Sequence, residues 1–150
     1  MTASAIPAAK ARAAPFTAPV HRQLAALCYR KGVAGREVLL VTSSTGRWIL
    51  PKGWPISGLR PGQAALVEAW EEAGVHKGTV ARKPLGAFMG SKFSESGDEE
   101  PCLTEVYAVK VAKTLDVYPE VGRRDRVWVS PDVAADMVQE DGLRAILAGF

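Results

Sequence analysis

The segment from Pro51 to Val75 (PKGWPISGLRPGQAALVEAWEEAGV) constrains the fold more than any other part of this chain. Its first half carries glycines and prolines and predicts a loop, whereas residues 63–73 contain no helix breaker and predict a helix. Gly74 follows directly, at the position where a left-handed C-cap belongs. The fold must therefore place one short helix between the strands that flank this segment.

Apolar runs on both sides of the segment predict those strands. Residues 23–29, 37–42 and 48–50 are predicted to form a meander, and three later strands are expected at 85–89, 104–111 and 126–129. A polar, mobile connection is expected over 90–101. Ser130 and Pro131 predict the start of a second helix, and a last helix is expected from about 141 to 147. This order predicts an α+β domain with a mixed β-sheet sandwiched between helices.

The composition narrows the class of protein. The 150 residues are 47% hydrophobic and 23% charged, which is ordinary for one globular domain. A net charge of +3 favours an anionic small molecule over nucleic acid as the partner. Two cysteines and two distant histidines supply neither a disulfide framework nor a zinc site.

The ends of the chain lead to expectations about its location. No apolar run is long enough to span a membrane. The N-terminal stretch MTASAIPAAKARAAPFTAPV has too many prolines and too short an apolar core for a signal peptide, although an alanine-rich, acid-free start is also a feature of organelle transit peptides. We expect a disordered tail over 1–18, a folded domain over 19–150 and a cytoplasmic protein.

Glu68, Glu71 and Glu72 crowd one side of the predicted helix. At 3.6 residues per turn they share an arc of about 100°, beside the apolar stripe rather than opposite it. No lysine or arginine on the helix is spaced to neutralise them, and acidic side chains near a helix C-terminus oppose its dipole. A divalent cation would turn this repulsion into binding. We therefore interpret the three as Mg²⁺ ligands, with the Gly53 carbonyl oxygen approaching the same ions.

The same segment resembles the Nudix box, G-x5-E-x7-R-E-U-x-E-E-x-G-U, of hydrolases that cleave diphosphates. Counted from Gly53, the three glutamates and Gly74 stand in register, and the spacing of 21 residues between the two glycines is kept. The flanking stretches EVLLVTSSTGRWILPKG and GRRDRVWVS resemble the diphosphoinositol polyphosphate phosphohydrolases. The likeness extends from about residue 21 to residue 136, and it implies the Nudix fold.

Three box positions depart from the pattern. Leu59 stands where the box has glutamate, Val67 where it has arginine and Ala69 where it has a bulky residue. The family's arginine is thought to pair with box carboxylates and hold them in place, which a valine cannot do. Either another cation replaces it, with Arg60 or a later arginine as candidates, or catalysis is impaired and the domain is a ligand-binding module.

The resemblance implies a Mg²⁺-dependent, or Mn²⁺-dependent, pyrophosphohydrolase in which water attacks a phosphorus of a P–O–P linkage. Glu68 and Glu72 would bind the metal, and Glu71 would bind it or orient the water. The general base would be Glu68 or Glu120, with the pair Glu99–Glu100 as further candidates.

The implied substrate is a multiply phosphorylated small molecule. It would be a diphosphoinositol polyphosphate or a dinucleoside polyphosphate or, alternatively, a nucleoside triphosphate or nucleotide sugar. Trp54 and Trp128 could stack on a base or pack at the edge of the core. Its phosphates would be bound by the cations near the box: Arg22, Arg47, Lys52, Arg123, Arg124 and Arg126.

Overall fold

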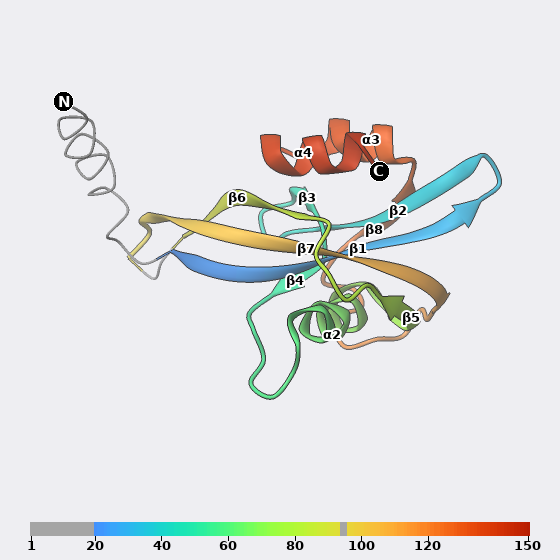
Figure 1. The fold of residues 1–150 in the computed structure, drawn as a ribbon, viewed down its shortest axis with the longest axis horizontal. Coiled ribbons are helices and arrows are strands. Elements are labelled where there is room, and N and C mark those ends of the chain that lie inside the picture. Colours follow the sequence, from blue (N-terminus) through green and yellow to red (C-terminus); the bar gives the residue numbers. More distant parts are fainter. Residues whose placement is uncertain (1–19, 94–95) are drawn as a thin grey trace, which may run out of the picture.

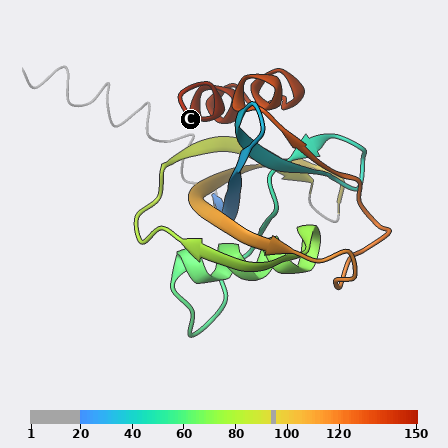
Figure 2. The same cartoon turned by 90° about the vertical axis from the view of Figure 1, so that its right-hand side faces the viewer.

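The computed structural model describes residues 20–93 and 96–150, and the tail expected over 1–18 lies outside the described residues. Within them, one sheet of eight strands is covered by α2 (Pro61–Ala73) on one face and by α3 (Pro131–Met137) and α4 (Asp141–Ala148) on the other (Figure 1). A view turned by 90° shows the same three layers (Figure 2). The predicted α+β fold is confirmed.

Two long strands, β1 and β7, run parallel at the centre of the sheet, and all the other pairings between the strands of the described residues are antiparallel. Strands β2 and β4 pair with different parts of β1. Strands β5 and β6 pair with different parts of β7, and strands β3 and β8 pair with β2. In chain order the strands are β1 (His21–Gly32), β2 (Gly35–Thr42), β3 (Trp48–Ile49), β4 (Lys52–Gly53), β5 (Val75–Val80), β6 (Gly86–Phe93), β7 (Glu99–Thr114) and β8 (Arg126–Val129).

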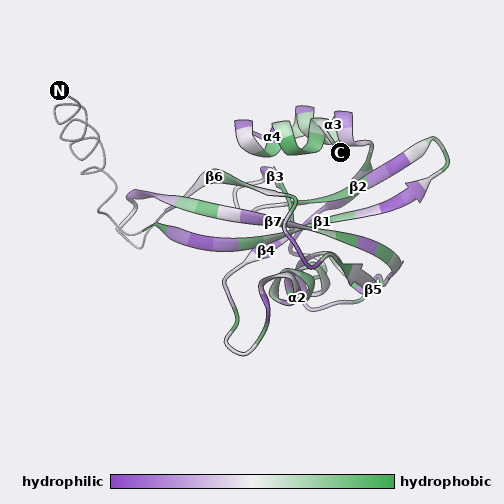
Figure 3. Ribbon diagram, viewed as in Figure 1, coloured by the Kyte–Doolittle hydropathy of each residue, from purple (hydrophilic) through white to green (hydrophobic). Residues whose placement is uncertain are grey.

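Side-chain alternation along β1 separates two cores. Leu24 and Cys28 pack toward α2, whereas Leu27 packs toward α3 and α4. Apolar residues accordingly dominate the middle of the central strands, while the strand ends are hydrophilic (Figure 3). Ala65 and Ala69 of α2 are fully buried, as the helical pattern predicts, and their small side chains let the helix lie close to the sheet.

The helix ends follow the local chemistry of the sequence. α2 begins at Pro61, two residues earlier than predicted, and Gly74 adopts the left-handed conformation expected of its C-cap, with φ 74° and ψ 21°. Ser130 caps α3 by accepting a hydrogen bond from the Val133 amide at 3.3 Å. None of the helices in the described residues is long and apolar enough to cross a membrane.

Three local expectations differ from the structure. The turn predicted over 30–36 is confined to Val33 and Ala34, because β1 and β2 continue as a hairpin up to those residues. The polar stretch 90–101 is largely strand, since β6 and β7 extend into it and pair through their backbones. β5 was not predicted: it follows α2 directly, is mostly exposed and contains Gly78, so that it lacks an apolar strand pattern.

Candidate active site

Strand β4 brings Gly53 against the glutamate face of α2. Gly53 is buried and pairs with Leu24 of β1. A Cβ atom at this glycine would lie 2.7 Å from Cγ of Glu68 and closer still to its carboxyl carbon. The absence of a side chain at Gly53 is therefore what lets the Glu68 carboxylate pack against the strand.

Glu72 is the most buried of the helix glutamates, with 5% of its surface exposed. The Lys52 amide donates to its Oε1 at 3.2 Å, and Nη2 of Arg124 lies 3.7 Å from its Oε2. Burial nevertheless raises the pKa of Glu72 to about 8, because Arg124 and the Lys52 amide oppose desolvation only in part and the charges of Glu68 and Glu120 add to it.

Glu68 also has a raised pKa, caused first by burial and then by the neighbouring Glu71 carboxylate. Glu120 raises it further, so four carboxyl groups from two elements share one site. Such crowded hard oxygen donors suit Mg²⁺ or Mn²⁺. Among the described residues, no three carboxylate, imidazole or thiolate side chains are already arranged to hold an ion together.

The connection between β7 and β8 brings Glu120 to the helix. Its amide donates to the Glu71 carbonyl oxygen at 2.9 Å, and the Leu115 amide donates to the Gly74 carbonyl oxygen at 2.9 Å. These bonds lay the connection along the C-terminal end of α2. The sequence alone contains no signal for this contact, because the partners are separated by about a third of the length of the domain. A hollow of about 210 Å³ opens beside Glu120, which lines it together with Ser44, Arg123 and Arg124.

The predicted phosphate-binding cations do not all gather at the glutamates. Arg22 pairs with Glu105 on the sheet, with Nε 3.0 Å from Oε1. Nη1 of Arg47 lies 3.7 Å from Oε2 of Glu140, next to α4. Adjacent residues of a strand project to opposite faces, so the Lys52 side chain is directed away from the face that carries Glu68.

Arg126 supports the end of α2. Its Nη1 donates to the carbonyl oxygens of Ala73 and Leu115, both at 2.8 Å, and its Nη2 donates to Asp116. A cation at this end satisfies an unpaired helix carbonyl and opposes the negative end of the dipole. Arg123 and Arg124 are thus the two predicted cations that line the hollow beside Glu120.

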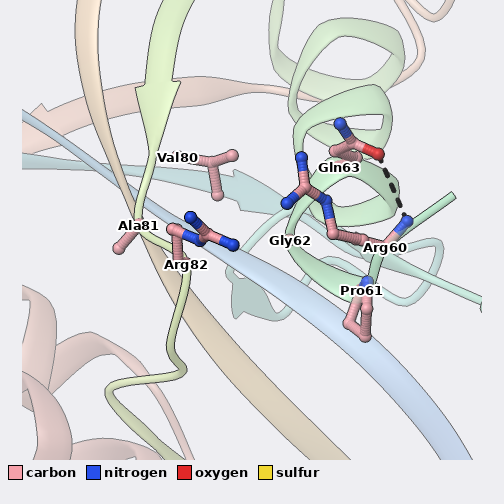
Figure 4. A pocket seen from close by; sticks show the side chains of 7 residues that line it. All are labelled: Arg60, Pro61, Gly62, Gln63, Val80, Ala81 and Arg82. Atoms are coloured by element: carbon pink, nitrogen blue, oxygen red, sulfur yellow. Dashed lines mark hydrogen bonds between the residues drawn. The ribbon is translucent and has the colours of Figure 1, made fainter.

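Arg60 lies at the opposite end of α2. It is the N-cap residue, and its amide donates to Gln63 Oε1 at 3.2 Å. Figure 4 shows its guanidinium group above Gly62, beside that of Arg82, in a hollow of about 280 Å³. Eight residues separate it from Glu68, about 12 Å along the helix axis. Arg60 therefore does not replace the box arginine.

The fold and the acidic site are those expected of an α+β hydrolase that acts on phosphate anhydrides. The NUDIX domain model matches residues 21–148, so the chain belongs to the Nudix family and is a pyrophosphohydrolase. The match covers most of the domain expected over 19–150.

Three relatives illustrate the similarity. Human diphosphoinositol polyphosphate phosphohydrolase 3-beta is 36% identical over 123 residues, which cover 79% of this chain and 69% of that protein. Arabidopsis thaliana Nudix hydrolase 12, mitochondrial, is 31% identical over 118 residues, 76% of this chain and 58% of that protein. A solved C. elegans Ap4A hydrolase complex has a TM-score of 0.62 at 21% identity, covering 87% of this chain and all of that one, and this likeness shows the shared fold.

Proposed function

We propose that the protein is a Mg²⁺-dependent hydrolase of diphosphate linkages in a multiply phosphorylated small molecule, such as a diphosphoinositol polyphosphate or a dinucleoside polyphosphate. The observation that carries the proposal is the cluster of four carboxyl groups beside a hollow lined by two arginines. The names of the human relative and of the C. elegans hydrolase agree with these two substrate classes.

The glutamates of α2 would hold the metal. Glu68 and Glu72 supply carboxylates, Gly53 supplies its carbonyl oxygen, and Glu71 binds the ion or orients the attacking water. A bound Mg²⁺ would neutralise the charge that develops on the phosphoryl oxygens. Mn²⁺ offers the same preference for oxygen ligands.

Glu120 is our first choice for the general base, and Glu68 is the alternative. The Glu120 carboxylate interacts with those of Glu68 and Glu72, and the loop that carries Glu120 is anchored to α2. It is also fixed in orientation, because Nε of Arg124 donates to its Oε1 at 3.0 Å. A base held in this way could take the proton of a water bound between the loop and the helix.

Arg123 is the best-placed residue for binding a substrate phosphate. It lines the hollow, is exposed, and within the described residues its side chain has no hydrogen-bond or ion-pair partner. A guanidinium group suits bidentate contacts to phosphate. Arg22, Arg47 and Arg126 are paired with protein groups in the structure, so a substrate would have to compete for them.

A second candidate function is hydrolysis of a nucleoside triphosphate or nucleotide sugar. Trp54 follows Gly53 directly and is 45% exposed, with the Lys92 ammonium 4.6 Å from its ring centre. An exposed indole directly after the proposed metal-binding glycine could stack on a base. This observation also fits the dinucleoside polyphosphates.

Phosphate release from a panel of substrates tests these functions. Inositol pyrophosphates, dinucleoside polyphosphates, nucleoside triphosphates and nucleotide sugars are each supplied with Mg²⁺. Turnover that is abolished by chelation and by Glu72→Gln supports the metal-dependent hydrolase. Binding of these compounds without turnover of any would favour a ligand-binding module and refute the catalytic proposal.

We also propose that the protein acts in the cytoplasm. Two Arabidopsis relatives are named as mitochondrial, so the compartment needs a direct test. Imaging of a fusion that keeps residues 1–19 intact and carries the fluorescent protein at its C-terminus provides it. Accumulation in an organelle would contradict the proposal.

A further inference from the structure

Helix α2 itself supplies no cation to its glutamates. Its sequence from Pro61 to Ala73 contains no lysine or arginine. Leu59 and Val67, the two box positions that lack their charged residues, line one apolar groove together with Leu66 and Trp70. The two positions therefore lie in the same groove, which has two apolar residues where the box has a glutamate and an arginine.

A remote arginine reaches the carboxylates from another element. Arg124 lies two residues before β8, and all three guanidinium nitrogens have protein partners. Nε donates to Glu120 Oε1 at 3.0 Å, Nη1 donates to the Thr42 carbonyl oxygen at 2.9 Å, and Nη2 lies 3.7 Å from Glu72 Oε2. The planar fork of arginine makes such a three-way contact geometrically specific.

The backbone around Arg124 is fastened on both sides. The Glu120 amide bonds to Glu71 of α2 at 2.9 Å. Asp125 exchanges two bonds with Thr42 at the end of β2, one from its amide to the threonine hydroxyl at 2.9 Å and one to its carbonyl oxygen at 3.1 Å. Arg124 thus stands at a junction of helix, loop and sheet, with 21% of its side chain exposed.

We propose that Arg124 is the positioning residue of this site: it holds Glu72 and Glu120 in place from the β7–β8 connection, because Val67 offers no cation on the helix. This inference rests on the proposed metal site. It differs from a substrate contact because the donors of Arg124 are directed at oxygens of the protein. Arg123, its exposed neighbour, is the residue left for the substrate.

Mn²⁺ binding in the absence of substrate, measured by electron paramagnetic resonance, separates the two roles. Loss of a group that orients a metal ligand typically weakens binding 10- to 100-fold. Arg124→Ala should therefore raise the Kd for Mn²⁺ at least about 10-fold and lower kcat, with KM at saturating metal changed less than about twofold. Arg124→Lys keeps the charge but not the fork, and should recover part of the affinity.

Two matched variants control for the loss of one positive charge. Arg123→Ala should raise KM and leave the Mn²⁺ affinity unchanged. Arg82→Ala, at the far end of α2, should change neither quantity. If Arg124→Ala unfolds, the Kd for Mn²⁺ of Arg124→Lys is compared with that of the wild-type protein instead.

A metal-free measurement provides an independent readout. Measured above pH 8, where the Glu72 carboxyl group is ionised, Arg124→Ala should lower the Tm of the wild-type protein by more than it lowers the Tm of a Glu72→Gln protein, because the second background no longer has a buried carboxylate to support. Equal shifts in both backgrounds would overturn the inference. So would an unchanged Mn²⁺ affinity with a raised KM, which would make Arg124 a substrate contact. A wild-type protein that binds no Mn²⁺ would instead refute the proposed metal site.

Discussion

Replacement of Gly53 by alanine tests the packing of β4 against the glutamate face most directly. The added Cβ would lie 2.7 Å from Cγ of Glu68, whereas carbon atoms pack at about 3.5 to 4.0 Å. Glu68 must therefore move by roughly 1 Å, because the backbone of Gly53 is held by its pairing with Leu24 of β1. A misplacement of this size can reduce turnover by about 10²-fold. The side chain is flexible, so the cost in stability should be only about 1 to 3 kcal/mol.

The assay compares Mg²⁺-dependent phosphate release with the free energy of unfolding in urea. Gly90→Ala is the matched control, since it adds the same methyl group to a strand where the nearest atoms lie 3.8 Å away. We expect Gly53→Ala to lose most of its kcat while remaining folded, and Gly90→Ala to retain its kcat. Wild-type turnover in a folded Gly53→Ala protein would show that the position of Glu68 does not limit catalysis.

Three further predictions concern charge. The pKa of Glu72 is raised to about 8 from its usual 4.5. Between these pH values the unfolded chain loses a proton that the folded protein keeps. The metal-free protein should therefore become less stable as pH rises, by a few kcal/mol in order of magnitude. Urea unfolding at pH 5 and 8 measures this, and Glu72→Gln should flatten the trend. Arg126→Ala leaves the Ala73 and Leu115 carbonyls without their donor and should cost about 1 to 3 kcal/mol by the same method; no change would mean that water replaces it. Glu120→Gln should lower kcat by about 10²-fold; an unchanged kcat would favour Glu68 as the base.

The sequence allowed the core of the site to be predicted because local rules determine it. Gly74 ends α2 in the left-handed conformation that glycine adopts most readily, and Pro61 starts the helix. The helical repeat then places Glu68 and Glu72 on one side. The same kind of local signal located α3, through the Ser130 cap. None of these features depends on residues distant in the chain.

The support for the carboxylates could not be predicted in this way. Arg124 was expected to bind phosphate, and nothing in the sequence around it indicates that its fork is occupied by Thr42, Glu72 and Glu120. Those contacts arise because β8 pairs with β2, which brings the β7–β8 connection to the end of α2. β5 was missed for a related reason: its strand is defined by backbone pairing with β7 rather than by apolar side chains.

The two charge losses in the box therefore do not have to mean a lost activity. Had only Val67 changed, a glutamate at position 59 would have been left beside the groove of Leu66 and Trp70 without a cation at position 67. With Leu59 also apolar, neither of the two box positions places a charge in the groove, and Glu72 of the same helix lies 3.7 Å from Arg124 instead. The acidic face of α2 is thus supported from the β7–β8 connection. Any movement of this connection would therefore shift the positions of Glu72 and Glu120.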